Sequence, residues 1–243
     1  MTFRIDLHVH TDASLDGLSS LAELAAAAKA AGLDAIAVAD HNLCTPVPEA
    51  LDGVLLIPAC EVSTQAGHIL GLFLDEPLDL DALRRDGLPS GAEAVAEIRR
   101  RGGIAVLAHP YEKPGAAPEN FDFRPDGVET VNARACFKVK DANQKAAALG
   151  SAWGLPATGG SDAHSGHEVG NAYTEVECGA LTLPALKAAV AAGHCRAVLV
   201  QGTPHLRKGL SQFAKRKRQG GVKNLAVGAA YVAWCAGKDL FRR

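Results

Sequence analysis

Short apolar segments recur along the chain, and each is followed by a turn containing Gly, Pro or Asp. Several of these segments are continuous apolar runs rather than alternating ones, which is typical of buried strands in a parallel sheet. The pattern therefore favours a parallel sheet that is covered on both faces. The expected strands are residues 5–9, 35–39, 54–59, 68–73, 104–108, 127–131, 156–159, 173–176 and 197–200.

Alanine-rich stretches with helical start and stop signals lie between several of these strands. Ser20 and Glu23 have the spacing of a capping box, and Gly32 can adopt the left-handed conformation that ends a helix. Because strands and helices alternate, we expect an α/β barrel or a doubly wound sheet. The expected helices are residues 21–31, 92–101, 138–153 and 183–192.

The composition indicates a globular protein with a sizeable core. Of the 243 residues, 48% are hydrophobic and 21% are charged, and six cysteines occur without a C-x-x-C pair. This excludes a zinc ribbon and a thioredoxin-like motif. No apolar stretch reaches the roughly 18 residues of a membrane-spanning helix. The first residues alternate like a strand and lack the pattern of a signal peptide, so we expect a cytoplasmic protein.

The charge is distributed unevenly between two parts of the chain. Residues 205–243 carry ten basic side chains and one acidic side chain, whereas residues 1–204 carry 15 basic and 26 acidic ones. We expect a main domain over 1–204 and a basic helical appendage over 205–243. The basic cluster at 215–218 suits nucleic acid or another polyanion, an anionic lipid surface, or a helix that docks on the barrel or on a second subunit.

Six of the nine histidines lie at or beside the ends of expected strands, together with carboxylates. His8 and His10 are two residues apart in the first strand, so both imidazoles point to one face and can bind one metal ion. Asp162 and His164 repeat this spacing after two glycines. These pairs predict a metal site at the rim of the sheet.

Five further candidate ligands share this position beside strand ends. They are Asp16, His41, Glu61, His68 and His109. A carboxylate such as Glu61 can bridge two ions, because each of its oxygens can bind a different cation. Helix capping remains the alternative role for Asp16, and a surface strand position remains the alternative for His68. The carboxyl ends of barrel strands meet at one rim, where enzymes of this architecture have their active sites.

Seven segments resemble, in chain order, the motifs of the polymerase and histidinol phosphatase (PHP) superfamily. They are DLHVHT, the Asp16-Gly17 turn, VADHN, CEVS, GHILGLF, LAHP and GGSDAH, and they span about residues 3–200. The resemblance implies a distorted (β/α)7 barrel that holds up to three divalent metal ions and hydrolyses phosphate esters.

The resemblance also implies a ligand set for each ion of a trinuclear site. One ion would be held by His8, His10, Glu61 and Asp162, a second by Glu61, His68 and His109, and a third by Asp16, His41 and His164. Two or three ions of Mn, Fe or Zn are expected, since imidazole and carboxylate ligands suit all three metals.

The expected reaction is the attack of a metal-bound hydroxide or water on a phosphomonoester of a small metabolite or nucleotide. Asp40 is expected to accept a hydrogen bond from a ligand imidazole. Arg134 and Asn132 are expected to bind the substrate, with a salt bridge as the alternative for Arg134.

Two other functions remain open at this point. A metal-dependent amidohydrolase also begins with H-x-H on a barrel, but it would be expected to use an isolated late Asp, whereas Asp162 here is paired with His164. A metal-stabilised regulatory module without turnover is the second alternative.

Overall fold

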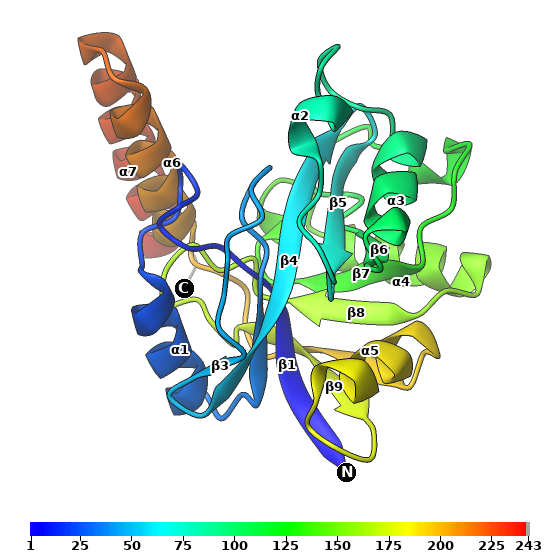
Figure 1. Ribbon diagram of the computed structural model, residues 1–243. Coiled ribbons are helices and arrows are strands. Elements are labelled where there is room, and N and C mark those ends of the chain that lie inside the picture. Colours follow the sequence, from blue (N-terminus) through cyan, green and yellow to red (C-terminus); the bar gives the residue numbers. More distant parts are fainter. Residues whose placement is uncertain (242–243) are drawn as a thin grey trace.

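The computed structural model describes residues 1–241, which form a mixed α/β fold with a nearly closed, barrel-shaped sheet (Figure 1). All nine expected strands are present, with ends that differ by a few residues, and the short β3 is additional. The expectation of a distorted barrel is confirmed. The strands in the described residues are β1 (Thr2–Val9), β2 (Ala35–Val38), β3 (Ala50–Leu51), β4 (Val54–Thr64), β5 (Gly67–Leu72), β6 (Ile104–Leu107), β7 (Gly127–Asn132), β8 (Ala157–Gly160), β9 (Ala172–Glu177) and β10 (Cys195–Leu199).

The strand order is β10-β9-β1-β2-β4-β5-β6-β7-β8, and β3 pairs with β4. Strands β1, β2 and β4 are parallel to one another, as are β6, β7 and β8. Strand β5 is antiparallel to β4 and β6, and β9 is antiparallel to β1 and β10. The expectation of a parallel sheet is wrong for these two strands. Only two residues separate β4 from β5, which permits a hairpin but no crossover.

The barrel closes where the segment after β8 meets β1. The backbone N–H of His10 donates to the carbonyl of Ala163 at 2.8 Å, and the N–H of Ala163 donates to the carbonyl of His8 at 3.2 Å. A Cβ added at Gly160 would lie 2.4 Å from the Cβ of His8, so this close approach requires glycine. The contact places the two ligand pairs of the sequence side by side.

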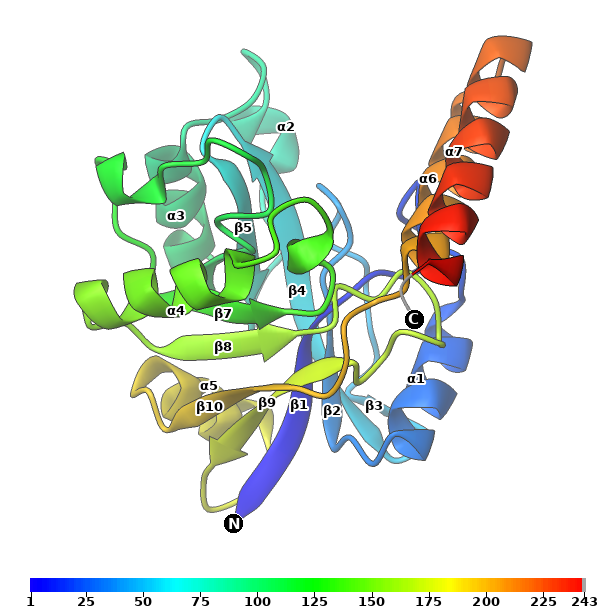
Figure 2. The same ribbon diagram turned by 180° about the vertical axis from the view of Figure 1, so that it is seen from behind.

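Helices cover the outside of the barrel (Figure 2). The capping box of Ser20 and Glu23 is confirmed, and Gly32 ends this region with a φ of +69°. The expected helix over 138–153 begins only at Ala142, because a 3-10 turn and a further turn precede it. The barrel helices are α1 (Leu21–Ala30), α2 (Leu80–Leu83), α3 (Gly91–Arg100), α4 (Ala142–Trp153) and α5 (Leu183–Ala191).

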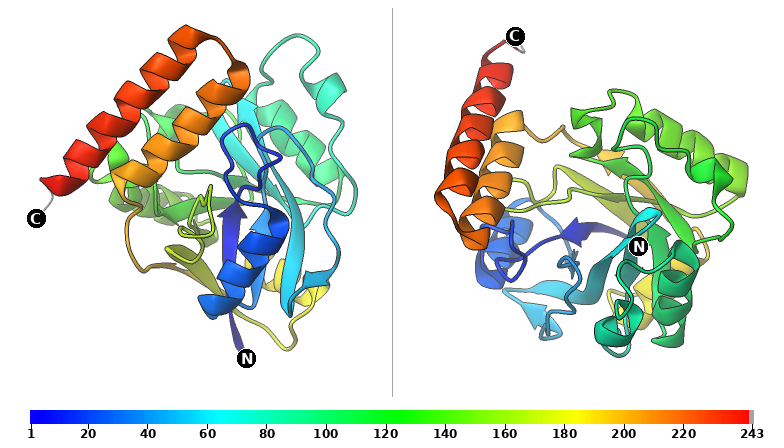
Figure 3. Two further views of the ribbon diagram at one scale, coloured as in Figure 1. Left: turned by 90° about the vertical axis from the view of Figure 1, so that its left-hand side faces the viewer. Right: turned by 90° about the horizontal axis from the view of Figure 1, so that it is seen from above.

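The C-terminal part of the described chain is an antiparallel helical hairpin of α6 (His205–Gln219) and α7 (Val222–Leu240). Figure 3 shows that α6 lies between α7 and the barrel. The carboxylate of Asp239 in α7 accepts hydrogen bonds from the backbone N–H groups of His205 and Leu206 at 3.0 and 2.8 Å. It thereby provides an acceptor for two N–H groups that have no partner within the first turn of α6. Residues 242–243 of the expected appendage lie outside the described residues. None of the helices within 1–241 combines the length and the apolar character that a membrane crossing requires.

Candidate metal centre

Glu61 is the central residue of a buried cluster at the carboxyl end of the barrel. Its Oε2 lies 3.4 Å from Nε2 of both His8 and His10. Asp162 Oδ1 lies 3.4 Å from Nε2 of His10 and 3.9 Å from Nε2 of His8. The four donors of the first expected ligand set therefore converge on one small volume.

The other oxygen of Glu61 faces a second group of donors. Oε1 lies 2.7 Å from Nδ1 of His68 and 3.1 Å from Nε2 of His109. The two oxygens of one carboxylate thus point to two different groups of imidazoles, which is the arrangement that a bridging ligand requires.

Asp16, His41 and His164 form a third group next to the first. Asp16 Oδ2 lies 3.7 Å from Nε2 of His41, and Asp16 Oδ1 lies 3.7 Å from Nε2 of His164. Nδ1 of His41 lies 2.8 Å from Glu61 Oε2 and connects this group to the centre. The structure therefore brings all nine candidate ligands together in one cluster, in which donors of different expected sets also lie close to one another.

Strained backbone at the strand ends turns some of these side chains into the site. His109 follows β6 with a φ of 27°, and Asp162 follows β8 with a φ of 55°. Asn42, directly after His41, has a φ of 51°. Residues with a side chain rarely adopt this region, and such strain is concentrated at functional sites.

Several buried polar atoms of the cluster have no hydrogen-bond partner within the described residues. They are Nε2 of His8, both ring nitrogens of His10, Oδ1 of Asp16, Oε2 of Glu61 and Nδ1 of His68. Buried polar atoms in native proteins nearly always have a partner. Imidazole nitrogens and carboxylate oxygens are also the preferred ligands of zinc and similar ions, so these residues fit divalent metals.

Burial and neighbouring charges shift the pKa values of the cluster in different directions, and burial together with His164 and His41 lowers the pKa of His10. Burial opposes the charge on Glu61, but the imidazoles of His68 and His41 outweigh burial and hold the pKa of Glu61 well below its usual range. Burial also opposes protonation of His109, yet the carboxylates of Glu61 and Glu112 raise its pKa to about 9. Protons and metal ions therefore compete for the same nitrogen atoms.

Glu129 in β7 orients one of the candidate ligands, a role that we did not predict. Its Oε1 accepts a hydrogen bond from Nδ1 of His8 at 2.9 Å, which leaves Nε2 of His8 free to bind a metal. Its Oε2 accepts from the backbone N–H of His109 at 2.9 Å. A carboxylate in the middle of a buried strand was the available signal, because a strand core has no packing reason to contain one.

The prediction that Asp40 accepts a hydrogen bond from an imidazole is wrong. Its carboxylate accepts from the backbone N–H of Thr11 at 2.8 Å, from Ser14 Oγ at 2.6 Å and from Thr45 Oγ1 at 2.5 Å. Those donors saturate the carboxylate and fix the loop that carries Asp16. Asp40 therefore positions the loop rather than a ring.

The two expected substrate-binding residues lie in different places. Asn132 is buried, donates to Glu129 at 3.0 Å and does not line the cavity, so its substrate contact stays a prediction. Arg134 lines the cavity, and the salt-bridge alternative also holds for it. Its guanidinium donates from Nε and Nη2 to Oε1 of the fully buried Glu168 at 2.9 and 2.5 Å.

A cavity of about 190 Å³ lies directly over the cluster. Its wall contains Asp16, His41, His68, His109, Asp162 and His164 on the barrel side, and Lys208, Gln212 and Lys215 on the side of α6. A second cavity of about 330 Å³ adjoins it and shares His68, His109 and Glu112. The C-terminal hairpin therefore contributes to the wall of the site.

Comparisons with known proteins agree with this geometry. A model of the PHP domain matches residues 6–95, and a PHP-associated model matches residues 140–195. An uncharacterized protein of Methanocaldococcus jannaschii is 31% identical over 147 residues, which cover 54% of this chain and 82% of that protein. A probable phosphatase of Vibrio campbellii is 27% identical over 209 residues, covering 70% of this chain and 81% of that protein.

Solved structures share the fold. A two-domain protein from Bacteroides vulgatus, described as containing a predicted PHP-like metal-dependent phosphoesterase, has a TM-score of 0.58 and 20% identity, and the match covers 82% of this chain and 65% of that one. A lesion-specific endonuclease from Pyrococcus furiosus has a TM-score of 0.57 and 18% identity, and the match covers 81% of this chain and 58% of that one. This chain thus spans less than two thirds of either protein.

The fold and the donor clusters define a barrel protein with a site for divalent metals. The chain belongs to the PHP family, as its motifs indicated.

Proposed function

We propose that the protein is a metal-dependent phosphoesterase that hydrolyses phosphomonoesters of small metabolites or nucleotides. The observation that carries this proposal is the position of Glu61, whose two oxygens face separate groups of imidazoles. Two or three ions of Mn, Fe or Zn would be held by the three ligand sets that meet at this residue. Bound divalent ions would activate water for attack and neutralise charge on the phosphoryl oxygens.

The chain itself would orient the ligands and bind the substrate. Glu129 holds the ring of His8 with Nε2 directed into the site. Arg134, fixed by its salt bridge with Glu168, places a guanidinium group at the wall of the cavity, where it can donate to a phosphate group.

The two adjoining cavities support a small substrate with a charged end and a less polar end. The cavity over the metal ligands has a volume of about 190 Å³ and a mostly polar lining. The neighbouring cavity of about 330 Å³ is lined in part by Pro110, Pro114, Ala116 and Phe121. The phosphate group would lie in the first cavity and the organic group in the second.

The experiment is phosphate release from a panel of nucleotides, sugar phosphates, histidinol phosphate and short oligonucleotides with added manganese. Metal-dependent release is expected from one or more monoesters, and it should be lost in His10→Ala and in Asp162→Ala. The matched control is His194→Ala, since His194 is exposed and lies outside the cluster. This variant should retain full activity.

Three other results would overturn the proposal. Turnover of amides or lactones without phosphate release would indicate an amidohydrolase. Preferred cleavage of the oligonucleotides would indicate a nuclease. Tight metal binding without any release, together with unfolding on chelation, would indicate a regulatory module.

A further inference from the structure

Helix α6 contributes three polar side chains to the cavity over the metal ligands. Lys208, Gln212 and Lys215 are spaced four and three residues apart, which places them on one face of the helix. That face points to the carboxyl end of the barrel, where all nine candidate ligands lie. The basic appendage is therefore part of the site and does not project freely into solvent.

The hairpin is attached to the barrel by polar contacts with residues around the site. Lys208 Nζ donates to Oε1 of Glu112 at 2.5 Å, and Lys215 Nζ donates to Oδ2 of Asp16 at 3.3 Å. Arg134 donates from Nη1 to Oγ of Ser211 in α6 at 3.1 Å. These contacts hold both ammonium groups at the edge of the cavity.

The contact between α6 and the barrel differs from ordinary helix packing. The buried residues of α6 are His205, Gly209 and Ser211, of which Gly209 packs against Cys235 of α7 and Ser211 contacts Arg134 of the barrel. A helix that only covers a barrel buries an apolar stripe, because apolar burial supplies most of the packing energy. The charges of α6 that face the cavity therefore require an explanation other than packing.

We propose that Lys208 and Lys215, together with Gln212, bind the phosphate group of the substrate. The proposal rests on the proposed phosphoesterase function. An ammonium group on a flexible stem is a common phosphate ligand, and Arg134 supplies a third, rigid cation at the same cavity. The amide of Gln212 lies between the two lysines in the sequence and offers a neutral donor.

The carboxylate partners of the lysines favour this role. Asp16 is also a candidate metal ligand, so a divalent ion would compete with Lys215 for its oxygens. The ammonium group of Lys215 is then available to a phosphate oxygen in the same cavity. Lys208 remains paired with Glu112, a residue that lines both cavities, and this pair fixes Lys208 at the wall of the cavity over the metal ligands.

The test compares Lys208→Met, Lys215→Met and the double variant with wild type, all loaded with manganese. Binding of inorganic phosphate is measured by calorimetry, and KM, kcat and metal content are measured in parallel. Loss of a hydrogen bond to a charged group should weaken phosphate binding about tenfold to a hundredfold in each single variant. KM should rise by a similar factor, with a smaller change in kcat and unchanged metal content.

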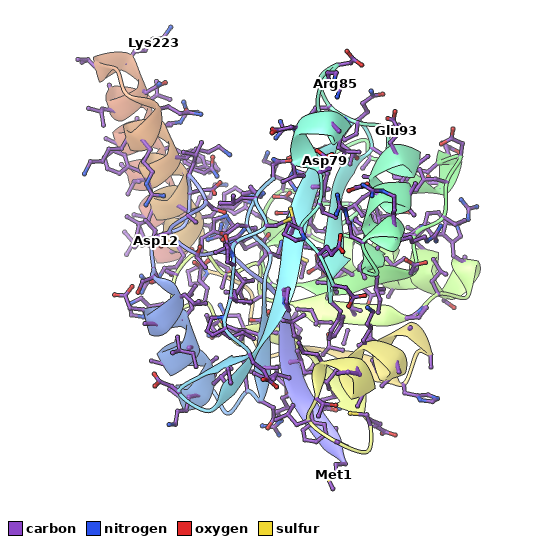
Figure 4. All side chains as sticks on the ribbon, in the orientation of Figure 1. Met1, Asp12, Asp79, Arg85, Glu93 and Lys223 are labelled. Atoms are coloured by element: carbon purple, nitrogen blue, oxygen red, sulfur yellow. The ribbon has the colours of Figure 1, made fainter. Side chains whose placement is uncertain are left out.

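The matched control is Lys223→Met. Lys223 lies at the outer end of the hairpin, away from the barrel (Figure 4), and is exposed. It carries the same charge but cannot reach the cavity, so this variant should bind phosphate as wild type does. Gln212→Glu adds a negative charge on the cavity face without removing either lysine contact, and it should also weaken phosphate binding about tenfold.

Direct phosphate binding separates this inference from the proposed function. If wild type hydrolyses monoesters and the lysine variants bind phosphate with unchanged affinity, the role of α6 is refuted and the phosphoesterase stands. If wild type binds phosphate through the lysines but hydrolyses no ester, the proposed function is refuted instead. A loss of metal content in Lys215→Met that accounts for all of its phosphate defect would also overturn the inference for Lys215.

Discussion

Replacement of Glu129 by Gln tests how the chain orients a metal ligand. The carboxylate of Glu129 is buried and accepts hydrogen bonds from Nδ1 of His8 at 2.9 Å, from the backbone N–H of His109 at 2.9 Å and from Nδ2 of Asn132 at 3.0 Å. It provides two acceptor oxygens for these donors. Glutamine has nearly the same shape but only one acceptor and one donor.

Either orientation of the glutamine amide creates a conflict. With its oxygen toward His109 and Asn132, the NH₂ group faces Nδ1 of His8, which must then accept a hydrogen bond and carry its proton on Nε2. That nitrogen lies 3.4 Å from Glu61 Oε2 and is the one directed at the metal site. With the amide reversed, the NH₂ group of the glutamine faces the backbone N–H of His109 and the side-chain N–H of Asn132. These buried donors then lack an acceptor, which costs about 1–3 kcal/mol of folding free energy.

We therefore expect Glu129→Gln to lower metal affinity about tenfold to a hundredfold, or about 1.4–2.7 kcal/mol. Manganese or zinc affinity is measured by competition with a chromophoric chelator, and unfolding is followed in parallel. The control is Glu175→Gln, because Glu175 lies on β9 and pairs with the exposed Arg196 far from the cluster. Metal affinity equal to wild type in Glu129→Gln would refute the assignment of this carboxylate as the orienting group.

Three other predictions concern burial, packing and pH. Glu168→Ala leaves the guanidinium of Arg134 buried without its partner, so thermal unfolding should show a loss of about 3–5 kcal/mol of stability. The control Glu175→Ala removes an exposed salt bridge and should cost less than about 1 kcal/mol. Equal losses of stability in the two variants would refute this prediction. Gly160→Ala places a methyl group 2.4 Å from the Cβ of His8 in β1, so it should cost about 1–3 kcal/mol of stability and reduce metal affinity. An unchanged melting temperature would show that the strand adapts to the methyl group. In the metal-free protein the pKa of His109 is raised to about 9, so its contribution to stability is full below pH 6.5 and is lost as pH rises toward 9. Metal binding should release protons at neutral pH and strengthen toward pH 9, and calorimetry in buffers of different ionisation enthalpy measures this release.

The sequence determined much of the barrel and its ligand groups. Apolar runs and turn residues located all nine expected strands, since burial of a strand requires an apolar run wherever the chain crosses the core. Most candidate ligand positions were predictable because they lie at or just after strand ends, which the topology of a barrel brings to one rim, whereas Glu61 lies within β4 and His68 near the start of β5. His8 and His10 show this most directly, as their spacing alone places both rings on one face.

The tertiary structure alone decided the partners of the groups around the ligands. Asp40 and Glu129 are both buried carboxylates, one just after β2 and one within β7, yet Asp40 accepts from a loop and Glu129 accepts from an imidazole. His8 and Glu129 are 121 positions apart in the sequence, and no local pattern specifies the hydrogen bond between them.

The position of the basic appendage was likewise decided by the tertiary structure. Its charge pattern agrees with a nucleic-acid surface, a lipid surface or a docked helix, because all three present cations on one side of a helix. Only the packing of α6 against the barrel shows that Lys208 and Lys215 face the cavity over the metal ligands. Local patterns determine which elements form, whereas contacts between distant segments depend on how those elements close around a shared core.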